Sequence, residues 1–189
     1  MKTIKNEVKD VYEIKKSEFL AYIYPVSNAD EVKAHLEDLR KAHKVATHVC
    51  YACLLTSPNM EKCSDDGEPD GTAGKPLLEL LKKKNLENIL LVVVRYFGGI
   101  KLGAGGLIRA YTRAGVMVCD KVEIVELKSY SNFVVKCNID NSKSILSKLN
   151  SLPLIVEGIE YSDVVKIKIK VETDMENIIL NLGGDIERC

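Results

Sequence analysis

Residues 64–113 contain a nearly uninterrupted apolar run, Ile89–Tyr96, with an unusual loop on each side of it. Such a run predicts a β-strand buried on both faces, because a strand with one solvated face alternates apolar and polar residues. The loop at 64–74 is acidic and the loop at 97–106 is rich in glycine. Each loop leads into a segment with the apolar spacing of a helix. The sequence therefore predicts a mixed α and β fold with a site built from two helix N-termini beside a strand end.

The acidic loop is the first candidate region. Its candidate site residues are Asp65, Asp66, Glu68, Asp70, Thr72 and Gly74. The acidic spacing matches the first half of a calcium-binding loop, but Leu77 stands where the bidentate glutamate belongs, so no metal is expected. Two interpretations stay open: a solvated turn whose aspartates bind backbone N–H groups, or a loop that faces a ligand. Thr72 or Gly71 is predicted to cap the following helix.

The glycine-rich loop is the second candidate region. It carries neither G-x-x-x-x-G-K-[ST] nor G-x-G-x-x-G, since Ile108 stands at the third glycine position. Free N–H groups at a helix start, with cations nearby, would still attract an anion. The candidate anion- or RNA-binding residues are Arg95, Gly98, Gly99, Lys101, Gly105, Arg109 and Arg113. The alternative is that the glycines serve close packing and Arg113 is only solvated.

A histidine and two cysteines lie on the predicted strand at 46–56. Cys50 and Cys53 form a CxxC, but a spacing of three residues puts them on opposite faces of a strand, which argues against a zinc or redox pair. Buried, reduced cysteine is expected instead. His48 shares a face with Cys50 and is a candidate site residue; the alternative is a hydrogen-bonded core histidine.

Charge and hydropathy restrict the classes of partner. The chain has 189 residues with 27 basic and 27 acidic side chains, so it is no polybasic nucleic-acid binder, although a local patch could still read RNA shape. Nothing in the sequence predicts DNA specificity. No apolar run approaches the roughly 20 residues of a membrane span, and the N-terminus lacks a secretory apolar region. We expect a cytoplasmic protein with reduced cysteines, no membrane partner and no cofactor.

The strand–helix pattern restarts after Glu126, which predicts two domains, 1–128 and 129–189. In the first, residues 122–127 are expected to close the sheet. In the second, strands at 133–139, 154–161 and 164–171 and helices at 142–149 and 175–182 predict a ferredoxin-like sandwich. Only about residues 185–189 remain for its last strand, so the sandwich is truncated.

Four segments of the chain closely resemble the Impact family, and more narrowly its bacterial YigZ-type branch. They are Lys16-Ser17-x-Phe19, the segment ATHVCYA from Ala46 to Ala52, SDDGEPDGTAGKP from Ser64 to Pro76, and VVVRYFGGIKLGAGGLIRAY from Val92 to Tyr111. The match covers residues 1–128, and the last two segments are specific. The remainder resembles that branch's C-terminal domain by its order of elements.

The resemblance implies an N-terminal domain akin to a ribosomal small-subunit protein and to ribonuclease PH, followed by a ferredoxin-like domain. It also implies a regulatory role in translation, because eukaryotic relatives regulate translation on ribosomes. The function expected for this chain is therefore RNA or ribosome association without catalysis. The alternative is an enzyme acting on a phosphorylated or carboxylated small molecule held between the two loops. A closed pocket joining His48, Asp65, Asp66 and Arg95 would favour the enzyme, and an open basic face would favour RNA.

Overall fold

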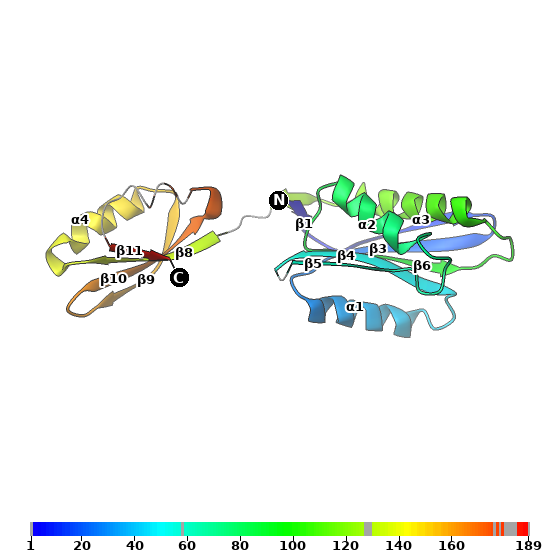
Figure 1. Cartoon of the computed structure of the whole chain (residues 1–189), viewed down its shortest axis with the longest axis horizontal. Coiled ribbons are helices and arrows are strands. Elements are labelled where there is room, and N and C mark those ends of the chain that lie inside the picture. The colour runs from blue at the N-terminus through cyan, green and yellow to red at the C-terminus, as the bar shows by residue number, and fades with distance from the viewer. Residues whose placement is uncertain are drawn as a thin grey trace. The chain divides into compact units, whose positions relative to one another are not determined.

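The computed structural model describes residues 2–57, 59–126, 130–175, 177, 179 and 185–188. The chain divides into two compact units, Met1–Leu127 and Lys128–Cys189, and each is described by itself (Figure 1). The predicted domain join near residue 128 lies outside the described residues. No helix in the described part of the chain is long and apolar enough to cross a membrane.

The first unit is built on a five-stranded sheet in the order β2-β3-β6-β4-β5, in which all neighbours are antiparallel. Its strands are β2 (Val8–Ile14), β3 (Ser17–Pro25), β4 (His48–Thr56), β5 (Asn59–Ser64) and β6 (Ile89–Tyr96). The central strand β6 has the predicted bounds, and only its last residue, Tyr96, is not fully buried. It is enclosed because helices cover both faces of the sheet, which confirms the α+β class predicted from the sequence.

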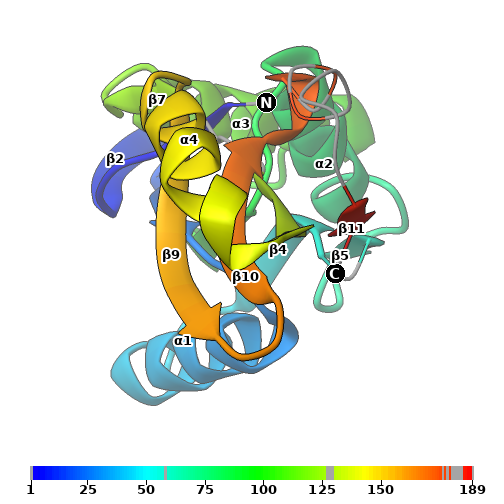
Figure 2. The same cartoon turned by 90° about the vertical axis from the view of Figure 1, so that its left-hand side faces the viewer.

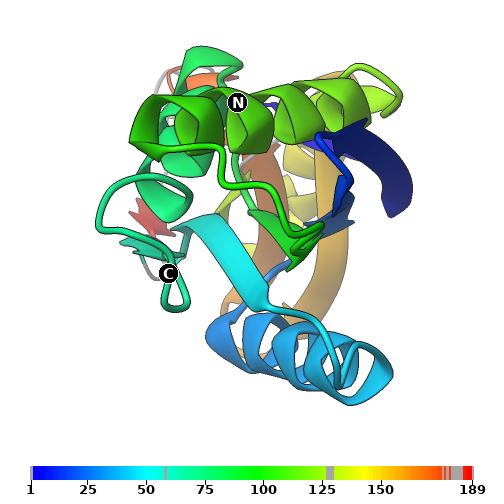
Figure 3. The same ribbon diagram turned by 90° about the vertical axis from the view of Figure 1, so that its right-hand side faces the viewer.

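Three helices enclose the sheet: α1 (Ala29–Ala42), α2 (Gly74–Lys83) and α3 (Ala104–Cys119). Helix α1 lies on one face, and α2 and α3 lie side by side on the other (Figure 3). Helix α1 begins after Asn28, a residue type favoured at helix starts, whose side chain accepts a hydrogen bond from the Glu31 N–H. Cys50 belongs to the core under α2 and α3, whereas Cys53 belongs to the core under α1, so the two cysteines do lie on opposite faces.

Three local predictions were wrong. Strand β7 (Ile124–Glu126) does not close the main sheet; it pairs with β1 (Lys2–Ile4) in a separate two-stranded sheet. Strand β5 was missed, because its polar sequence at the edge of the sheet lacks the apolar alternation of a half-buried strand. Helix α2 begins at Gly74, and neither Thr72 nor Gly71 caps it.

The second unit is a four-stranded antiparallel sheet in the order β11-β8-β10-β9. Its elements are β8 (Tyr130–Cys137), α4 (Ile139–Asn150), β9 (Leu154–Tyr161), β10 (Val165–Glu172), a short 3-10 turn (Thr173–Met175) and β11 (Asp185–Arg188). Figure 2 shows β9 and β10 side by side. The short last strand forms and pairs with β8, which completes the ferredoxin-like order. The helix predicted at 175–182 lies largely outside the described residues.

Candidate functional site

The acidic loop is held by its first carboxylate, which replaces the missing helix cap. Asp65 Oδ1 accepts from the N–H groups of Ala73 and Gly74 at 2.9 and 2.8 Å, and Oδ2 accepts from Gly71 at 2.9 Å. Burial opposes ionisation of Asp65, but these backbone hydrogen bonds together outweigh it and lower its pKa. Asp65 therefore serves the start of α2, where a negative charge is also favoured by the helix dipole.

The second aspartate fastens the loop to β4 and α1. Asp66 Oδ2 accepts from the Val49 N–H at 2.7 Å, and Oδ1 pairs with Arg40 at 3.1 Å. The backbone oxygen of Asp66 lies 2.8 Å from His48 Nδ1. A carbonyl oxygen can only accept, so His48 Nδ1 carries a proton, and in the neutral ring Nε2 is an acceptor. Asp66 adopts φ 43°, a left-handed conformation that this web of contacts stabilises.

A buried ion pair between Glu68 and Arg95 joins the acidic loop to the end of β6, just before the glycine-rich loop. Glu68 Oε1 accepts from Arg95 Nη1 at 2.6 Å and from the Tyr111 hydroxyl at 2.8 Å. The side chains of Glu68 and Arg95 are only 3% and 6% exposed. The enzyme interpretation would join Asp65 and Asp66 to Arg95 in one pocket, but both aspartates bind other groups, and the carboxylate that reaches Arg95 is that of Glu68.

The strand register explains why Arg95 lies here. On β6 it is paired with Phe19 of β3 on one side and His48 of β4 on the other. Its guanidinium carbon lies 5.4 Å from the ring centroids of both Phe19 and Phe97. Its Nε is buried and donates to no residue that the structure describes. Arg95 is thus a structural cation at the base of the site, stabilised by Glu68 and two aromatic rings.

The glycine-rich loop is shaped by close approach and by turns. A side chain at Gly98 would lie 1.9 Å from the backbone of Lys16, so only glycine fits where this loop meets the β2–β3 turn. The Gly98 N–H also donates to Ser17 Oγ at 3.1 Å, and the Phe97 N–H donates to Thr47 Oγ1 at 3.0 Å. Gly103 has φ 73° and precedes α3 without any side-chain cap. Gly99 and Gly105 meet no such close neighbour.

The cations of the glycine-rich loop and of α3 are exposed. Lys101, Arg109 and Arg113 all lie at the surface, and within the described ranges none of them has a carboxylate partner. Lys15 and Lys16, in the turn against Gly98, are exposed as well. We call these five residues the basic face. By contrast, Asp70 is exposed and Thr72 is buried, with its hydroxyl donating to the Pro69 oxygen at 2.6 Å.

A cavity of 440 Å³ opens where the two loops converge. Its lining combines the polar residues Thr47, His48, Glu68, Arg95 and Lys101 with Pro69, Phe97, Leu102, Gly103, Ala104 and Leu107. We call it the loop cavity. It joins His48 to Arg95 as the enzyme interpretation requires, but Asp65 and Asp66 do not line it. The volume of this cavity, and its lining of apolar side chains with a few polar ones, are typical of a site for a small ligand.

Cys50 lies beneath the acidic loop and is no nucleophile. Its thiol donates to the Asp65 oxygen at 3.0 Å and lies 3.4 Å from the Tyr111 hydroxyl. Burial raises the pKa of Cys50 to about 12, so the thiol stays protonated at neutral pH. Burial likewise raises the pKa of Tyr111 far above its ordinary range.

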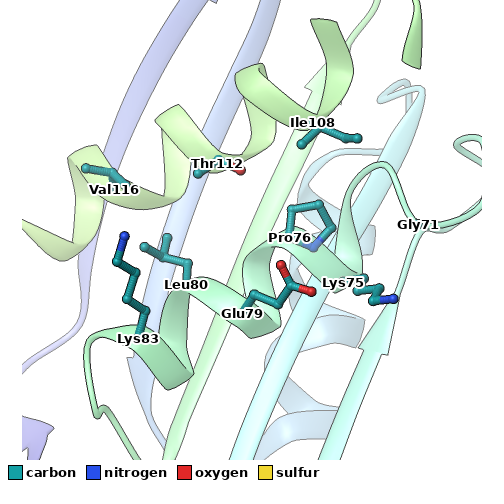
Figure 4. A pocket seen from close by; sticks show the side chains of 9 residues that line it. All are labelled: Gly71, Lys75, Pro76, Glu79, Leu80, Lys83, Ile108, Thr112 and Val116. Carbon is teal, nitrogen blue, oxygen red and sulfur yellow. The ribbon is translucent and has the colours of Figure 1, made fainter. Parts of the chain in front are cut away.

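A second cavity, of 480 Å³, lies between α2 and α3. Figure 4 shows Lys75, Glu79 and Lys83 of α2 opposite Ile108, Thr112 and Val116 of α3. Its charged side chains lie at the surface. It has neither the buried charges nor the converging loops of the loop cavity.

Sequence reasoning missed three contributors to the site: Phe97, Tyr111 and the Lys15–Lys16 turn. Tyr111 resembled an ordinary core residue of α3, and its hydroxyl contacts Glu68, which lies 43 residues earlier in the chain. Phe97 follows the buried strand inside the glycine-rich loop, and its place in that loop was the one available signal.

Comparison with known proteins agrees with this architecture. The Impact N-terminal domain model matches residues 15–119. The IMPACT family member YvyE of Bacillus subtilis is 36% identical over 176 residues, which cover 93% of this chain and 81% of that protein. YigZ of Escherichia coli, also an IMPACT family member, is 45% identical over 104 residues, 53% of this chain and 51% of YigZ.

The crystal structure of a hypothetical protein aligns with this chain at a TM-score of 0.71 and 28% identity. The alignment covers 99% of this chain and 95% of that chain. The match to YvyE spans both units, whereas the match to YigZ spans about half of each protein. The family model covers both loops, the buried Glu68–Arg95 pair and the start of α3. From the motifs, the fold and these matches, the chain belongs to the Impact family.

Proposed function

We propose that this protein binds RNA, free or within the ribosome, through the basic face, and that it regulates translation without catalysing a reaction. The observation that carries the proposal is the unneutralised charge of that face. Other surface cations of the first unit, such as Lys5, Lys82 and Lys84, lie within 3.1 Å of a carboxylate, and single lysines such as Lys9 and Lys44 are exposed without one in the described residues. The cations around the start of α3 have no such partner in the described parts of the chain.

The backbone supports the same use of this surface. The N-terminal N–H groups of α3 have no side-chain cap, and Gly105 beside them is exposed. Arg109 and Arg113 are four residues apart and share one side of the helix. Uncapped N–H groups and exposed guanidinium groups are donors suited to phosphate oxygens.

The second unit contributes less charge than its sequence suggests. Lysines alternate with apolar residues along β10 and would suggest a second basic strip, but Lys168 pairs with Glu160 at 2.6 Å and Lys170 lies 3.9 Å from Glu157. We therefore assign the phosphate contacts to the first unit. The link to translation rests on membership of the Impact family and on the role in translation that the resemblance implies for its eukaryotic relatives.

Salt dependence of RNA binding tests the proposal. The full chain is titrated against a single-stranded oligoribonucleotide at several salt concentrations. Each phosphate contact contributes about −0.7 to the slope of log affinity against log salt, so Arg109→Ala with Arg113→Ala should flatten the slope by about 1.4. The matched control is Lys33→Ala with Lys41→Ala, which should leave the slope unchanged. These two cations of α1 lie on the opposite face of the sheet and already have carboxylate neighbours. An unchanged slope in the arginine double variant, or no RNA binding by the wild type, contradicts the proposal.

The enzyme alternative is favoured by one observation, that His48, Glu68 and Arg95 line the same cavity. It predicts that a phosphorylated or carboxylated compound binds and is turned over, and that its binding raises the melting temperature of the protein. Such compounds are screened for turnover and for a shift in melting temperature, with the wild type and with His48→Ala. A compound that binds without turnover counts against catalysis.

A further inference from the structure

We propose that the loop cavity receives one unstacked guanine base of the RNA that binds the basic face. This inference rests on the proposed function and adds base specificity to it. Sequence-specific recognition of RNA uses single-stranded bases that are splayed out, stacked on aromatic side chains and bound along their hydrogen-bonding edges. The loop cavity supplies each of these elements.

The first element is a pair of hydrogen-bond acceptors. Because His48 Nδ1 donates to the Asp66 oxygen, Nε2 of the neutral ring is an acceptor. Glu68 Oε1 is occupied by Arg95 and Tyr111, whereas its Oε2 accepts no hydrogen bond from the described residues. His48 Nε2 and Glu68 Oε2 lie 3.8 Å apart, too far for a hydrogen bond to each other. Both residues line the cavity, so a ligand that donates twice would satisfy both acceptors.

The second element is an exposed aromatic ring. Phe97 lines the cavity and is 45% exposed, with the Arg95 guanidinium 5.4 Å from its centroid. The Thr47 hydroxyl holds the Phe97 backbone N–H, which positions the ring at the cavity rather than leaving it on a free loop. A base stacked on such a ring gains affinity whatever its identity, because every base has a π face.

The third element is the position of the cations. Lys101 and the uncapped start of α3 at Gly103 and Ala104 line the same cavity. Arg109 follows one turn along α3, and its guanidinium lies near Gly105. A nucleotide whose base enters the cavity can therefore place its phosphate against the basic face. The volume of 440 Å³ is in the range of pockets that hold small ligands.

The acceptor pair selects among the four bases. Guanine presents two adjacent donors, N1–H and the 2-amino group, on its Watson–Crick edge. Adenine and cytosine each place one amino group beside a ring acceptor, and uracil places one N–H between two carbonyls. Guanine alone offers donors on two neighbouring atoms of that edge, one for His48 Nε2 and one for Glu68 Oε2. Uracil has a single donor, and adenine and cytosine would have to use both hydrogens of one amino group, which places their ring acceptor beside one of the two protein acceptors.

The test compares four oligouridine heptamers that carry guanine, adenine, cytosine or uracil at the centre, at pH 8 and constant salt. Guanine should bind the wild type roughly tenfold more tightly than the others, since a good two-bond base contact discriminates by about that factor or more. Asparagine at position 48 can keep a donor for the Asp66 oxygen while lacking the Nε2 acceptor. His48→Asn should therefore reduce the guanine preference to less than about twofold.

Phe97→Ala tests the stacking element separately. It should weaken binding of all four heptamers by roughly tenfold, and Phe97→Leu, which keeps apolar bulk without a π face, should weaken them to a similar degree. The matched control is His35→Asn, on α1 across the sheet, which should keep the guanine preference.

The outcomes separate the two proposals. Steep salt dependence with equal affinity for all four heptamers overturns the guanine pocket while RNA binding stands. No heptamer binding contradicts the proposed function. Guanosine monophosphate is titrated alone as a further arm: if it binds through His48 while no heptamer does, the cavity serves a free nucleotide and the RNA assignment is overturned. Retention of the guanine preference by His48→Asn also overturns the inference.

Discussion

The acidic loop and the glycine-rich loop have opposite uses for their charges. In the acidic loop, Asp65 and Asp66 are engaged through both carboxylate oxygens by groups inside the protein, and Glu68 is engaged through Oε1. Around the glycine-rich loop, Lys101, Arg109 and Arg113 point to solvent without a partner among the described residues. Both regions are equally suggestive in sequence. The difference shows that a cluster of charged residues marks a binding site only when those charges are not already paired within the protein.

The largest expected effect comes from breaking the buried pair. Glu68→Ala should lower the free energy of unfolding by about 3–5 kcal/mol, because Arg95 would remain buried without its carboxylate. Urea denaturation measures the loss. The control, Asp70→Ala, removes an exposed carboxylate of the same loop and should change stability by less than about 0.5 kcal/mol. Equal effects of the two substitutions would show that the acidic loop is a solvated turn.

A smaller loss is expected at the helix cap. Asp65→Ala should cost about 1–2 kcal/mol, since the Ala73 and Gly74 N–H groups at the start of α2 and the Gly71 N–H in the loop lose their acceptor. The pKa of Asp65 is lowered by folding, so its contribution is present above the pKa of an unfolded aspartate and disappears as the pH falls through the folded value. The stability difference between wild type and variant should therefore shrink on acidification. A difference that is constant from neutral to strongly acidic pH would refute the role of the charge.

The substitution Arg109→Ala tests the other side of the comparison. With its guanidinium exposed and unpaired, its loss should change stability by less than about 0.5 kcal/mol while weakening the salt dependence of RNA binding. If an acidic-loop carboxylate held Arg109, the melting temperature would fall and the salt slope would stay. Arg95→Ala is the contrasting variant, expected to unfold the protein far more easily because Glu68 would be left buried and alone.

We propose that the two units fold independently. Separating them should therefore have the smallest effect on the stability of the first unit. Limited proteolysis should cut near residues 127–130 and release a folded piece that holds both loops. Because every contact compared above lies within the first unit, that piece should keep the stability differences of the Glu68 and Asp65 variants. Resistance of the full chain to cleavage there, or unfolding of the released piece, would contradict independent folding.

Much of the fold could be predicted because its signals are local. The apolar run of β6, the Asn28 cap of α1 and the opposite orientation of Cys50 and Cys53 depend on periodicity and on side chains a few residues apart. The strand predicted at 164–171 likewise forms as β10, and its alternating residues Val165, Ile167, Ile169 and Val171 lie in the core. Where periodicity was weak, as in β5, the prediction failed.

The partners within the site could not be predicted, because they depend on tertiary contacts. Four carboxylates lie within six residues, and no local rule says which one reaches Arg95, 27 residues after Glu68. The pairing follows from the β3-β6-β4 register, which sets Arg95 beside His48, and from Asp65 turning back to the start of α2. The sequence by itself thus determined the family, most of the elements and the two loops, but not the polar edge strand β5 or the pairing of β7. The tertiary structure decided which charges the fold consumes and which it leaves for a ligand, because burial and hydrogen bonding act between residues that only folding brings together.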